Sequence, residues 1–263
     1  MNRETEQSKK KSDNLICRMP YKVNSSNTDM NRRLRAGALT DLLIQAAINS
    51  ADQLHAGFNQ IREQHLFWVL SRITVEIHKI LHWYQCGEVE TWPKNIEKII
   101  YLRDFLVKDE KQDIAVRATS GWLALDTDTK RPQTIKGDLP HVFTTLKDIH
   151  ALQILPEKLI PVKEGEISEL ISTYFDIDLN GHVTASRYLD WMMDTFTVEF
   201  HRNHYPRLFS INYLNETWIH ERVQLTKTVI NDDTFLFEGF NLNRNIIAFL
   251  GKIVFKPDKA INK

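Results

Sequence analysis

Three polar side chains of different chemistry stand at alternate positions of one short run, Asp178, Asn180 and His182. The run directly precedes a stretch in which apolar residues recur at helical spacing, so the three side chains are expected beside the first turn of a helix. Unpaired backbone N–H groups at such a helix end can stabilise developing negative charge. An imidazole can carry a proton, a carboxamide can bind a carbonyl oxygen or a water, and a carboxylate can orient its neighbours. This combination is the outline of a hydrolytic site.

The same run also begins like a calcium-binding loop, because Asp176, Asp178 and Asn180 occupy the first, third and fifth positions of that motif. The twelfth position needs a bidentate carboxylate and here holds Arg187, a cation that would repel the ion, so a metal site is disfavoured. The remaining alternative is a turn that only caps the helix, since Asp, Asn and Gly are common turn residues. Taken by itself, the run is at least as consistent with that turn as with an active site.

An internal repeat makes it less favoured that the run is only a turn that caps the helix. Residues 29–41 align without a gap on residues 178–190, and Asp, Asn, Ala and a later Asp coincide. Both segments lead into an amphipathic stretch, which predicts two copies of one domain. The first copy has Arg33 where the second has His182, so only the second retains a group that titrates near neutral pH. The repeat therefore predicts a duplicated fold with one chemically competent half.

Composition narrows the class of protein. Lysine plus arginine and aspartate plus glutamate both number 34, so no overall basic charge favours nucleic acid as a partner. The two cysteines, Cys17 and Cys86, form no CxxC motif, which disfavours a disulfide framework or zinc site and favours a reducing, cytoplasmic location. No apolar run is long enough to predict a membrane span. Residues 1–14 are polar and lack the apolar core of a signal peptide, so we expect a disordered N-terminal tail.

The order of predicted elements also repeats. After the first helix, alternating apolar and polar residues predict strands over 68–77, 88–92, 96–107 and 114–125. Residues 138–163 contain three prolines and are typical of a linker, with one short helix expected around 142–152. The second copy is expected to hold a strand at 168–174, the polar run, a helix to about residue 200, and strands at 210–228, 234–241 and 245–255. One central helix wrapped by an antiparallel sheet, twice over, is an α+β architecture.

Several further motifs occur in a fixed order from about Cys17 to Phe255. In the first half they are Trp68-Val-Leu-Ser-Arg72, Val89-Glu-Thr-Trp-Pro93, Arg103-Asp-Phe105 and Arg117-Ala-Thr-Ser-Gly-Trp122 through Asp128-Thr-Lys-Arg131. In the second half they are Asp178-Leu-Asn-Gly-His-Val183, Tyr188, Trp191 and Tyr213-Leu-Asn-Glu216. In this order they resemble the acyl-acyl-carrier-protein (acyl-ACP) thioesterases of the plant and bacterial fatty-acid type, which are tandem pairs of hotdog domains. The resemblance implies an N-terminal hotdog at 15–137, a linker at 138–163 and a C-terminal hotdog at 164–263.

The resemblance further implies that the second hotdog is catalytic, with Asp178, Asn180, His182 and Glu216 as its polar set, and that the first hotdog holds the acyl chain. We expect Glu216 on the strand after the helix, where it and His182 would position a water and take its proton. Which of the two is the base stays open. The Asn180 amide and the N–H groups at the helix end would hold the oxyanion, and Asp178 would orient its neighbours. A thiolate leaves readily, so the reaction needs no metal and no cofactor.

Two positions depart from the pattern of the relatives. Thr184 and Ala185 replace a pair of asparagines, and we expect the Thr184 hydroxyl to cap the helix. Thr217 follows Glu216 where many relatives carry a cysteine, and a threonine hydroxyl is a poor nucleophile without a dedicated base. Direct attack by water is therefore favoured. The alternatives are an acyl-CoA thioesterase and a non-catalytic hotdog protein that binds acyl chains.

An acyl chain needs an apolar slot, and small residues recur along the first helix. We expect the slot to be lined by Leu43, Ala46 and Ala47 of that helix and by Trp68 and Ile73 of the next strand. The alanines could equally serve close packing of helix and sheet. The expected partner is the acidic acyl carrier protein, for which Arg32, Arg33 and Arg35 are the predicted docking residues. A homodimer formed through the hotdog sheets is left open.

Overall fold

The computed structural model describes residues 14–257, so the predicted tail at 1–14 lies outside the described residues except for Asn14. The N-terminal half consists of β1 (Cys17–Lys22), the 3-10 helix η1 (Ser25–Asn27), α2 (Ala36–Gln53), α3 (Phe58–Arg62), β2 (Leu66–Ile77), β3 (Cys86–Glu97), β4 (Ile100–Asp109), β5 (Ile114–Asp126) and β6 (Pro132–Gln133). The connection contains α4 (Leu139–Thr144). The C-terminal half consists of β7 (Glu166–Ile171), η2 (Tyr174–Asp176), α5 (Ala185–Met193), α6 (Val198–Asn203), β8 (His204–Tyr213), β9 (Arg222–Asn231), β10 (Thr234–Asn241) and β11 (Ile246–Pro257).

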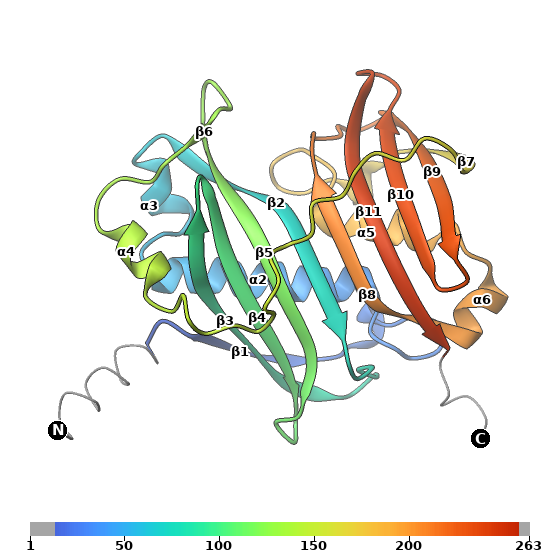
Figure 1. Ribbon diagram of the computed structural model, residues 1–263, viewed down its shortest axis with the longest axis horizontal. Coiled ribbons are helices and arrows are strands. Elements are labelled where there is room, and N and C mark those ends of the chain that lie inside the picture. The colour runs from blue at the N-terminus through green and yellow to red at the C-terminus, as the bar shows by residue number, and fades with distance from the viewer. Residues whose placement is uncertain (1–13, 258–263) are drawn as a thin grey trace.

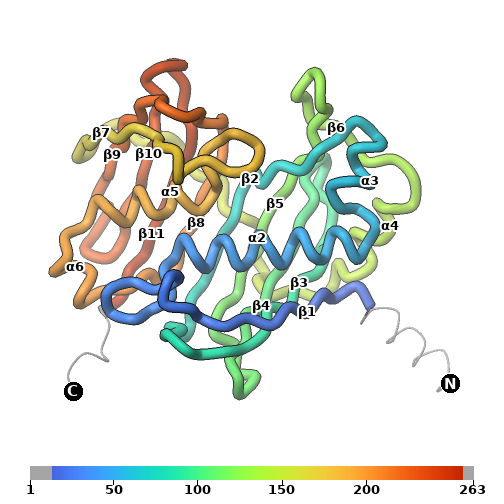
Figure 2. The backbone as a smooth tube through the Cα atoms, turned by 180° about the vertical axis from the view of Figure 1, so that it is seen from behind, coloured from blue at the N-terminus to red at the C-terminus, as the bar shows by residue number. Residues whose placement is uncertain are grey.

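The strands form one antiparallel sheet in the order β1-β3-β4-β5-β2-β8-β11-β10-β9-β7, with β6 beside β5. The two halves meet where β2 pairs with β8, and Ile73 lies opposite Ile211 at this junction. Helices α2 and α5 lie on the same face of the sheet, as Figure 1 and Figure 2 show from opposite sides. The predicted α+β fold of two tandem hotdog units, each with a central helix against an antiparallel sheet, is confirmed. No helix in the part of the chain described here is long and apolar enough to cross a membrane.

The repeat found in the sequence corresponds to matching pieces of structure. Helix η1 precedes the first copy of the polar run and η2 precedes the second, and each run is closed by a short bridge, Thr28 with Leu34 and Ile177 with Val183. The equivalent strands β2 and β8 pair antiparallel, so the two halves are related by an approximate two-fold rotation. The two copies of the run therefore lie on opposite sides of the molecule, at the two ends of the antiparallel strands β2 and β8.

The two halves fill the space between helix and sheet differently. The buried face of α2 consists largely of small residues, including Gly37, Ala46, Ala47 and Ser50. In the C-terminal half, phenylalanine rings from the segment after α5, from α6 and from strands β10 and β11 form a cluster with centroids 4.7–6.1 Å apart, made of Phe196, Phe200, Phe235, Phe237 and Phe255. These large rings occupy much of the volume between helices and strands in the C-terminal half, whereas the small side chains of α2 occupy little.

The connection between the halves crosses the face of the sheet opposite the helices (Figure 1). Glu157 N donates to Thr74 Oγ1 at 3.0 Å on β2, and Asn212 Nδ2 of β8 donates to Glu157 O at 2.7 Å. The Glu157 carboxylate also pairs with Lys252 of β11 at 2.9 Å. The connection thus fastens both sides of the β2–β8 junction.

Four predicted elements differ from the observed ones. The strand expected at 96–107 includes the turn between β3 and β4, so β3 ends later and β4 begins later than predicted. The helix expected at 142–152 is replaced by the earlier and shorter α4, because residues after it bind the sheet instead; Ala151 N donates to Asp104 Oδ2 at 2.7 Å. The single helix expected to residue 200 is two helices, since the Thr197 hydroxyl accepts from Phe200 N and starts α6. The single strand expected at 210–228 is β8 and β9, with a loop at 214–221 between them.

Candidate active site

The polar run folds into a tight loop that is shaped by Asp178. Asp178 Oδ1 accepts hydrogen bonds from Asn180 N at 2.8 Å and from His182 N at 3.4 Å, and Asp178 N donates to His182 O at 2.8 Å. Gly181 has a φ of +82°, a left-handed conformation that favours glycine. The carboxylate of Asp178 therefore holds the backbone of the loop, which is a more specific task than the general orienting role predicted from sequence.

His182 faces Glu216 across the mouth of this loop. His182 Nε2 lies 3.2 Å from Glu216 Oε2, and their side chains are 21% and 42% exposed. The Trp218 ring stands edge-on to the imidazole with centroids 4.3 Å apart. Partial exposure lets water and substrate reach the pair, while the indole fixes the plane of the imidazole. The chain brings together the two residues predicted to act on the water, although they are 34 positions apart in the sequence.

Glu216 does not lie on a strand, and that part of the prediction is wrong. It belongs to the loop that follows β8, which leaves the sheet because Leu214 N and Asn215 N both donate to Ala248 O, at 2.9 and 3.0 Å. The loop then meets the polar run through Val183 N, which donates to Thr217 O at 2.8 Å. Arg244 Nη1 donates to the Glu216 carbonyl at 2.7 Å. These bonds leave the Glu216 carboxylate free to face His182.

Helix α5 begins immediately after the loop. Thr184 is its N-cap residue, but its hydroxyl makes no capping hydrogen bond, so the predicted cap is wrong; the Thr184 N–H instead donates to Asp176 O at 2.8 Å. Asn180 is exposed, and its side chain is not held by a hydrogen bond to the described part of the chain. Arg187 Nε donates to Asp176 Oδ1 at 2.7 Å, so a guanidinium already occupies the first carboxylate of the calcium-like pattern.

Tyr188 is a residue near the site that the sequence singled out only by its place in a motif. It is 4% exposed, under the loop, and burial together with the nearby Glu216 and Asp178 carboxylates raises its pKa to about 12. The phenol therefore stays protonated at neutral pH.

Thr217, also buried, and the thiols of Cys17 and Cys86 in the other half take no part in the His182–Glu216 contact.

The first copy of the loop has the same backbone conformation, but the residue at the position of His182 is the buried Arg33. Asp29 Oδ1 accepts from Asn31 N at 2.8 Å and from Arg33 N at 2.9 Å, as Asp178 does in the second copy. Arg33 is 2% exposed and donates to the carbonyls of His201 and His204, at 2.6 and 3.1 Å. The guanidinium therefore joins the first half to the second instead of reaching solvent.

Comparison with known proteins identifies the family of the chain. The sequence model of the acyl-ACP thioesterase N-terminal domain matches residues 14–143, and that of the C-terminal domain matches residues 160–255. The chain belongs to the acyl-ACP thioesterase family.

One curated protein is similar to the chain in sequence, and two solved structures are similar to it in fold. The chain is 25% identical over 222 residues to oleoyl-acyl carrier protein thioesterase 1, chloroplastic, of Arabidopsis thaliana, covering 78% of this chain and 61% of that protein. Its fold matches the crystal structure of an acyl-ACP thioesterase from Bacteroides thetaiotaomicron with a TM-score of 0.83 and 24% identity, over 93% of this chain and 99% of that one. It also matches a 12:0-ACP thioesterase from Umbellularia californica with a TM-score of 0.81 and 21% identity, over 93% and 98% of the two chains.

The residues predicted to line the acyl slot of this acyl-ACP thioesterase family member are brought together only in part. Leu43, Ala46, Ala47 and Ile73 belong to one buried cluster and are at most 5% exposed. Trp68 lies in a separate cluster with Tyr101 and Phe143, and its Nε1 donates to Ala56 O at 2.8 Å. Trp68 therefore supports the end of α2 and α3 rather than facing the alanines.

A buried arginine that the sequence analysis did not assign to the site lies at the end of this row of small residues. Arg103 Nη1 donates to Ser50 Oγ at 2.8 Å and to Thr91 Oγ1 at 3.2 Å, one helical turn beyond Ala46 and Ala47. Burial lowers the Arg103 pKa to about 10, so it remains charged at neutral pH. The signal in the sequence was an arginine at an inward position of an otherwise apolar alternating strand.

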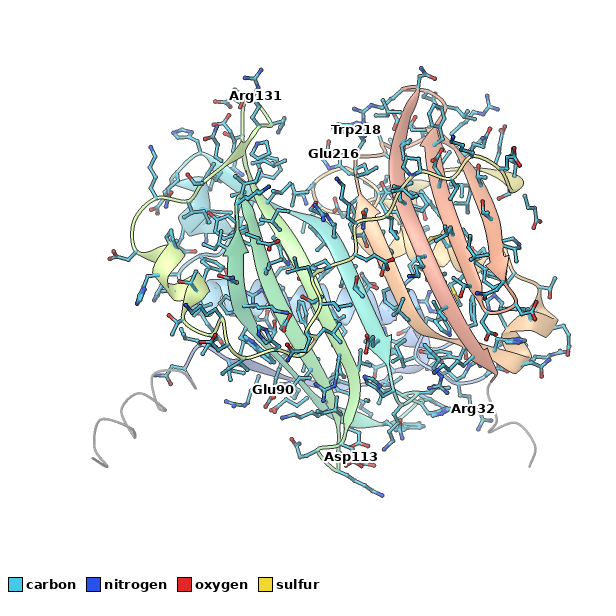
Figure 3. All side chains as sticks on the ribbon, in the orientation of Figure 1. Arg32, Glu90, Asp113, Arg131, Glu216 and Trp218 are labelled. Atoms are coloured by element: carbon cyan, nitrogen blue, oxygen red, sulfur yellow. The ribbon has the colours of Figure 1, made fainter. Side chains whose placement is uncertain are left out.

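The predicted docking arginines of this family member do not form a surface near the site. Arg33 is buried, as described, and Arg35 pairs with Asp190 at 3.3 Å. Arg32 is exposed, but it lies at the opposite end of the molecule from Glu216 and Trp218 (Figure 3). The approximate two-fold rotation explains this separation, because the two copies of the loop lie at opposite ends of the strands.

Proposed function

We propose that this protein hydrolyses the thioester of acyl-ACP, releasing a free fatty acid and the thiol of the carrier. The chain spans 61% of the length of the Arabidopsis thioesterase that it resembles. Its activity is therefore inferred from the residues of its own site. The observation that carries the proposal is the 3.2 Å contact of His182 Nε2 with Glu216 Oε2, in the one copy of the loop that retains a histidine.

The chemistry follows from the positions of the four polar residues. A water bound beside the His182–Glu216 pair attacks the carbonyl carbon, and its proton passes to that pair. The carbonyl electrons move to oxygen, and the resulting oxyanion is stabilised by the Asn180 amide and the N–H groups at the start of α5. When the intermediate collapses the C–S bond breaks, its electrons leave with sulfur, and the thiolate takes the proton from the pair. Asp178 keeps the loop in the conformation that these steps need.

The acyl chain is assigned to the N-terminal half. Small residues line α2 there, whereas phenylalanine rings fill the C-terminal half around the end of α5. We retain Leu43, Ala46, Ala47 and Ile73 as the lining and omit Trp68, which packs elsewhere. The division into hotdog units at 15–137 and 164–263 with a linker at 138–163 is part of the same proposal.

The proposal is tested by measuring fatty-acid and thiol release from a series of acyl-ACP substrates of increasing chain length, and from the same acyl groups on CoA. We expect turnover with carrier-bound substrates at lower KM than with CoA. Turnover of CoA substrates alone would assign the protein as an acyl-CoA thioesterase. Tight binding of acyl-ACP without product release would make it an acyl-binding protein and overturn the proposed hydrolysis.

A further inference from the structure

Large apolar side chains are exposed around the mouth of the site. Tyr174, Phe175 and Leu179 are 74%, 89% and 93% exposed, and Trp218 and Ile219 are 44% and 40% exposed. We call these five residues the apolar collar. Leu179 lies between Asp178 and Asn180, and Trp218 follows Glu216 by two positions, so the collar belongs to the same two loops that carry the polar residues. Clustered exposed apolar residues of this size mark interaction surfaces.

The loops under the collar are held by hydrogen bonds. Asp176 Oδ2 accepts from Thr173 N at 2.7 Å, which fixes η2 and with it Tyr174 and Phe175. Trp218 N donates to Glu221 Oε2 at 2.7 Å. The Tyr174 and Phe175 rings also contact each other edge-on, with centroids 5.4 Å apart. The apolar surface is therefore presented by a fixed backbone, which lowers the entropic cost of binding a partner.

Comparison of the two copies of the repeat separates this feature from the needs of the fold. The helix η1 of the first copy carries Ser25 and Ser26 at the positions of Tyr174 and Phe175 in η2. Both copies form the same 3-10 turn and the same loop after it. The turn does not require aromatic rings, and only the copy that retains the histidine has them.

We propose that the apolar collar is the surface on which the acyl carrier protein docks. This inference rests on the proposed function, since the scissile thioester is at the end of the carrier's own prosthetic arm. To bring that bond to His182 and Glu216, the body of the carrier must lie over the loops that border these side chains, and the collar is their exposed part.

Charge on the same edge suits an acidic carrier. Lys130 and Arg131 are exposed in the turn between β5 and β6 of the N-terminal half. Arg131 lies along the edge that also carries Glu216 and Trp218 (Figure 3). Apolar contacts from the collar and cations beside it form a surface of the kind that binds and steers an acidic protein. This assignment replaces Arg32, Arg33 and Arg35, which lie at the other end.

The test compares the wild-type protein with Tyr174→Ser/Phe175→Ser, which copies the serines that already form this turn in the first repeat. Leu179→Ser is a second collar variant, and Met30→Ser is its matched control, because the two residues are equivalent in the repeat and only Leu179 is in the collar. Kd for an acidic acyl carrier protein is measured by titration, and kcat/KM is measured with acyl-ACP and with the same acyl group on a small thiol.

We expect the collar variants to raise Kd and KM for the carrier-bound substrate about tenfold or more, as for loss of interface anchors, with hydrolysis of the small thioester unchanged. Met30→Ser should behave like the wild type. Equal losses with both substrates, or no change in Kd, would overturn the docking assignment. Because Kd is measured without turnover, an inactive wild-type protein would disprove the proposed function and still report on docking.

A second measurement separates the carrier from other occupants of the collar. Wild type and Tyr174→Ser/Phe175→Ser are sedimented with phosphatidylglycerol vesicles and compared by size-exclusion chromatography. We expect no vesicle binding and the same elution volume for both proteins. Collar-dependent vesicle binding with unchanged Kd for the carrier would assign the surface to lipid, and a collar-dependent change of mass would assign it to a second copy of the chain.

Discussion

Two equivalent positions, His182 and Arg33, have opposite tasks at the residue scale. Each follows an aspartate whose carboxylate accepts the backbone N–H groups of the loop, Asp178 in one copy and Asp29 in the other. His182 is partly exposed and contacts Glu216, whereas Arg33 is buried and binds backbone carbonyls of the other half. The two loops therefore share one backbone conformation, and the side chain at the end of each either faces Glu216 near the surface or packs inside the molecule.

The first prediction concerns the His182–Glu216 pair. His182→Ala and Glu216→Gln should each lower kcat with acyl-ACP by about 10²-fold or more, because both remove acid–base help. The kcat of the double variant should be only slightly lower than that of the less active single variant, since the two residues act as one unit. Steady-state kinetics on variants with wild-type circular dichroism provide the measurement. Additive losses would show that the two side chains act in separate steps.

The second prediction concerns Asp178. Asp178→Asn retains an oxygen that can accept from Asn180 N and His182 N, so kcat should stay within about tenfold of wild type. Asp178→Ala removes the acceptor, lets the loop shift, and should cost about 10²-fold, the effect expected for small misplacement of catalytic groups. Equal loss in both variants would instead indicate that the negative charge itself is required.

At the element scale, the first helix has a row of small buried residues that ends at a polar group. Ala46 and Ala47 bury their methyl groups against the sheet, and one turn later Ser50 binds the charged guanidinium of Arg103. An apolar chain lying along this row would end before Arg103, because leaving a buried charge beside a methyl end is unfavourable. The small residues and the arginine together give the proposed slot an apolar wall and a polar end.

The third prediction tests this row. Ala46→Phe should raise the ratio of kcat/KM for shorter over longer acyl-ACP substrates, because the ring fills the proposed slot. Overpacking will also lower the free energy of unfolding by about 1–3 kcal/mol, which a denaturant titration records. Loss of stability with an unchanged chain-length preference would assign the alanines to helix–sheet packing alone.

One continuous sheet makes the two halves a single unit at the scale of the whole molecule. β2 pairs with β8, and the connection between the halves binds to this junction on one face of the sheet. Arg33 also joins the two halves, through its hydrogen bond to the His201 carbonyl on the side away from the site. Because the halves are related by an approximate two-fold rotation and only the second copy has a histidine, the molecule has one candidate active site. The equivalent loop at the opposite side is a structural joint, held by Arg33.

The fourth prediction concerns that joint. Arg33→Met should lower the free energy of unfolding by about 3 kcal/mol, because Asp29 and the His201 and His204 carbonyls lose a buried cation. The kcat of the folded variant should stay near wild type, since His182 lies at the other edge. Thermal unfolding and kinetics below the transition provide the measurement. A large loss of kcat without a loss of stability would connect Arg33 to the chemistry.

Local pattern in the sequence determined much of this protein. Periodicity predicted β5 at 114–125 and β10 at 234–241 almost to the residue, and the repeat predicted two similar halves of which one keeps a histidine. These features depend on neighbours along the chain, so they can be recognised without tertiary structure. The family resemblance supplied Glu216, and the structure brings that residue into contact with His182.

Only the tertiary structure decided which distant residues meet. The burial of Arg33, the separation of Trp68 from Ala46, the contact of Arg103 with Ser50 and the exposed collar all depend on how far-apart segments pack, and side-chain periodicity carries no record of that packing. The positions of the predicted docking arginines depend on packing in the same way. Arg32 is near its helix in sequence, but the antiparallel pairing of β2 and β8 places that helix end opposite the site.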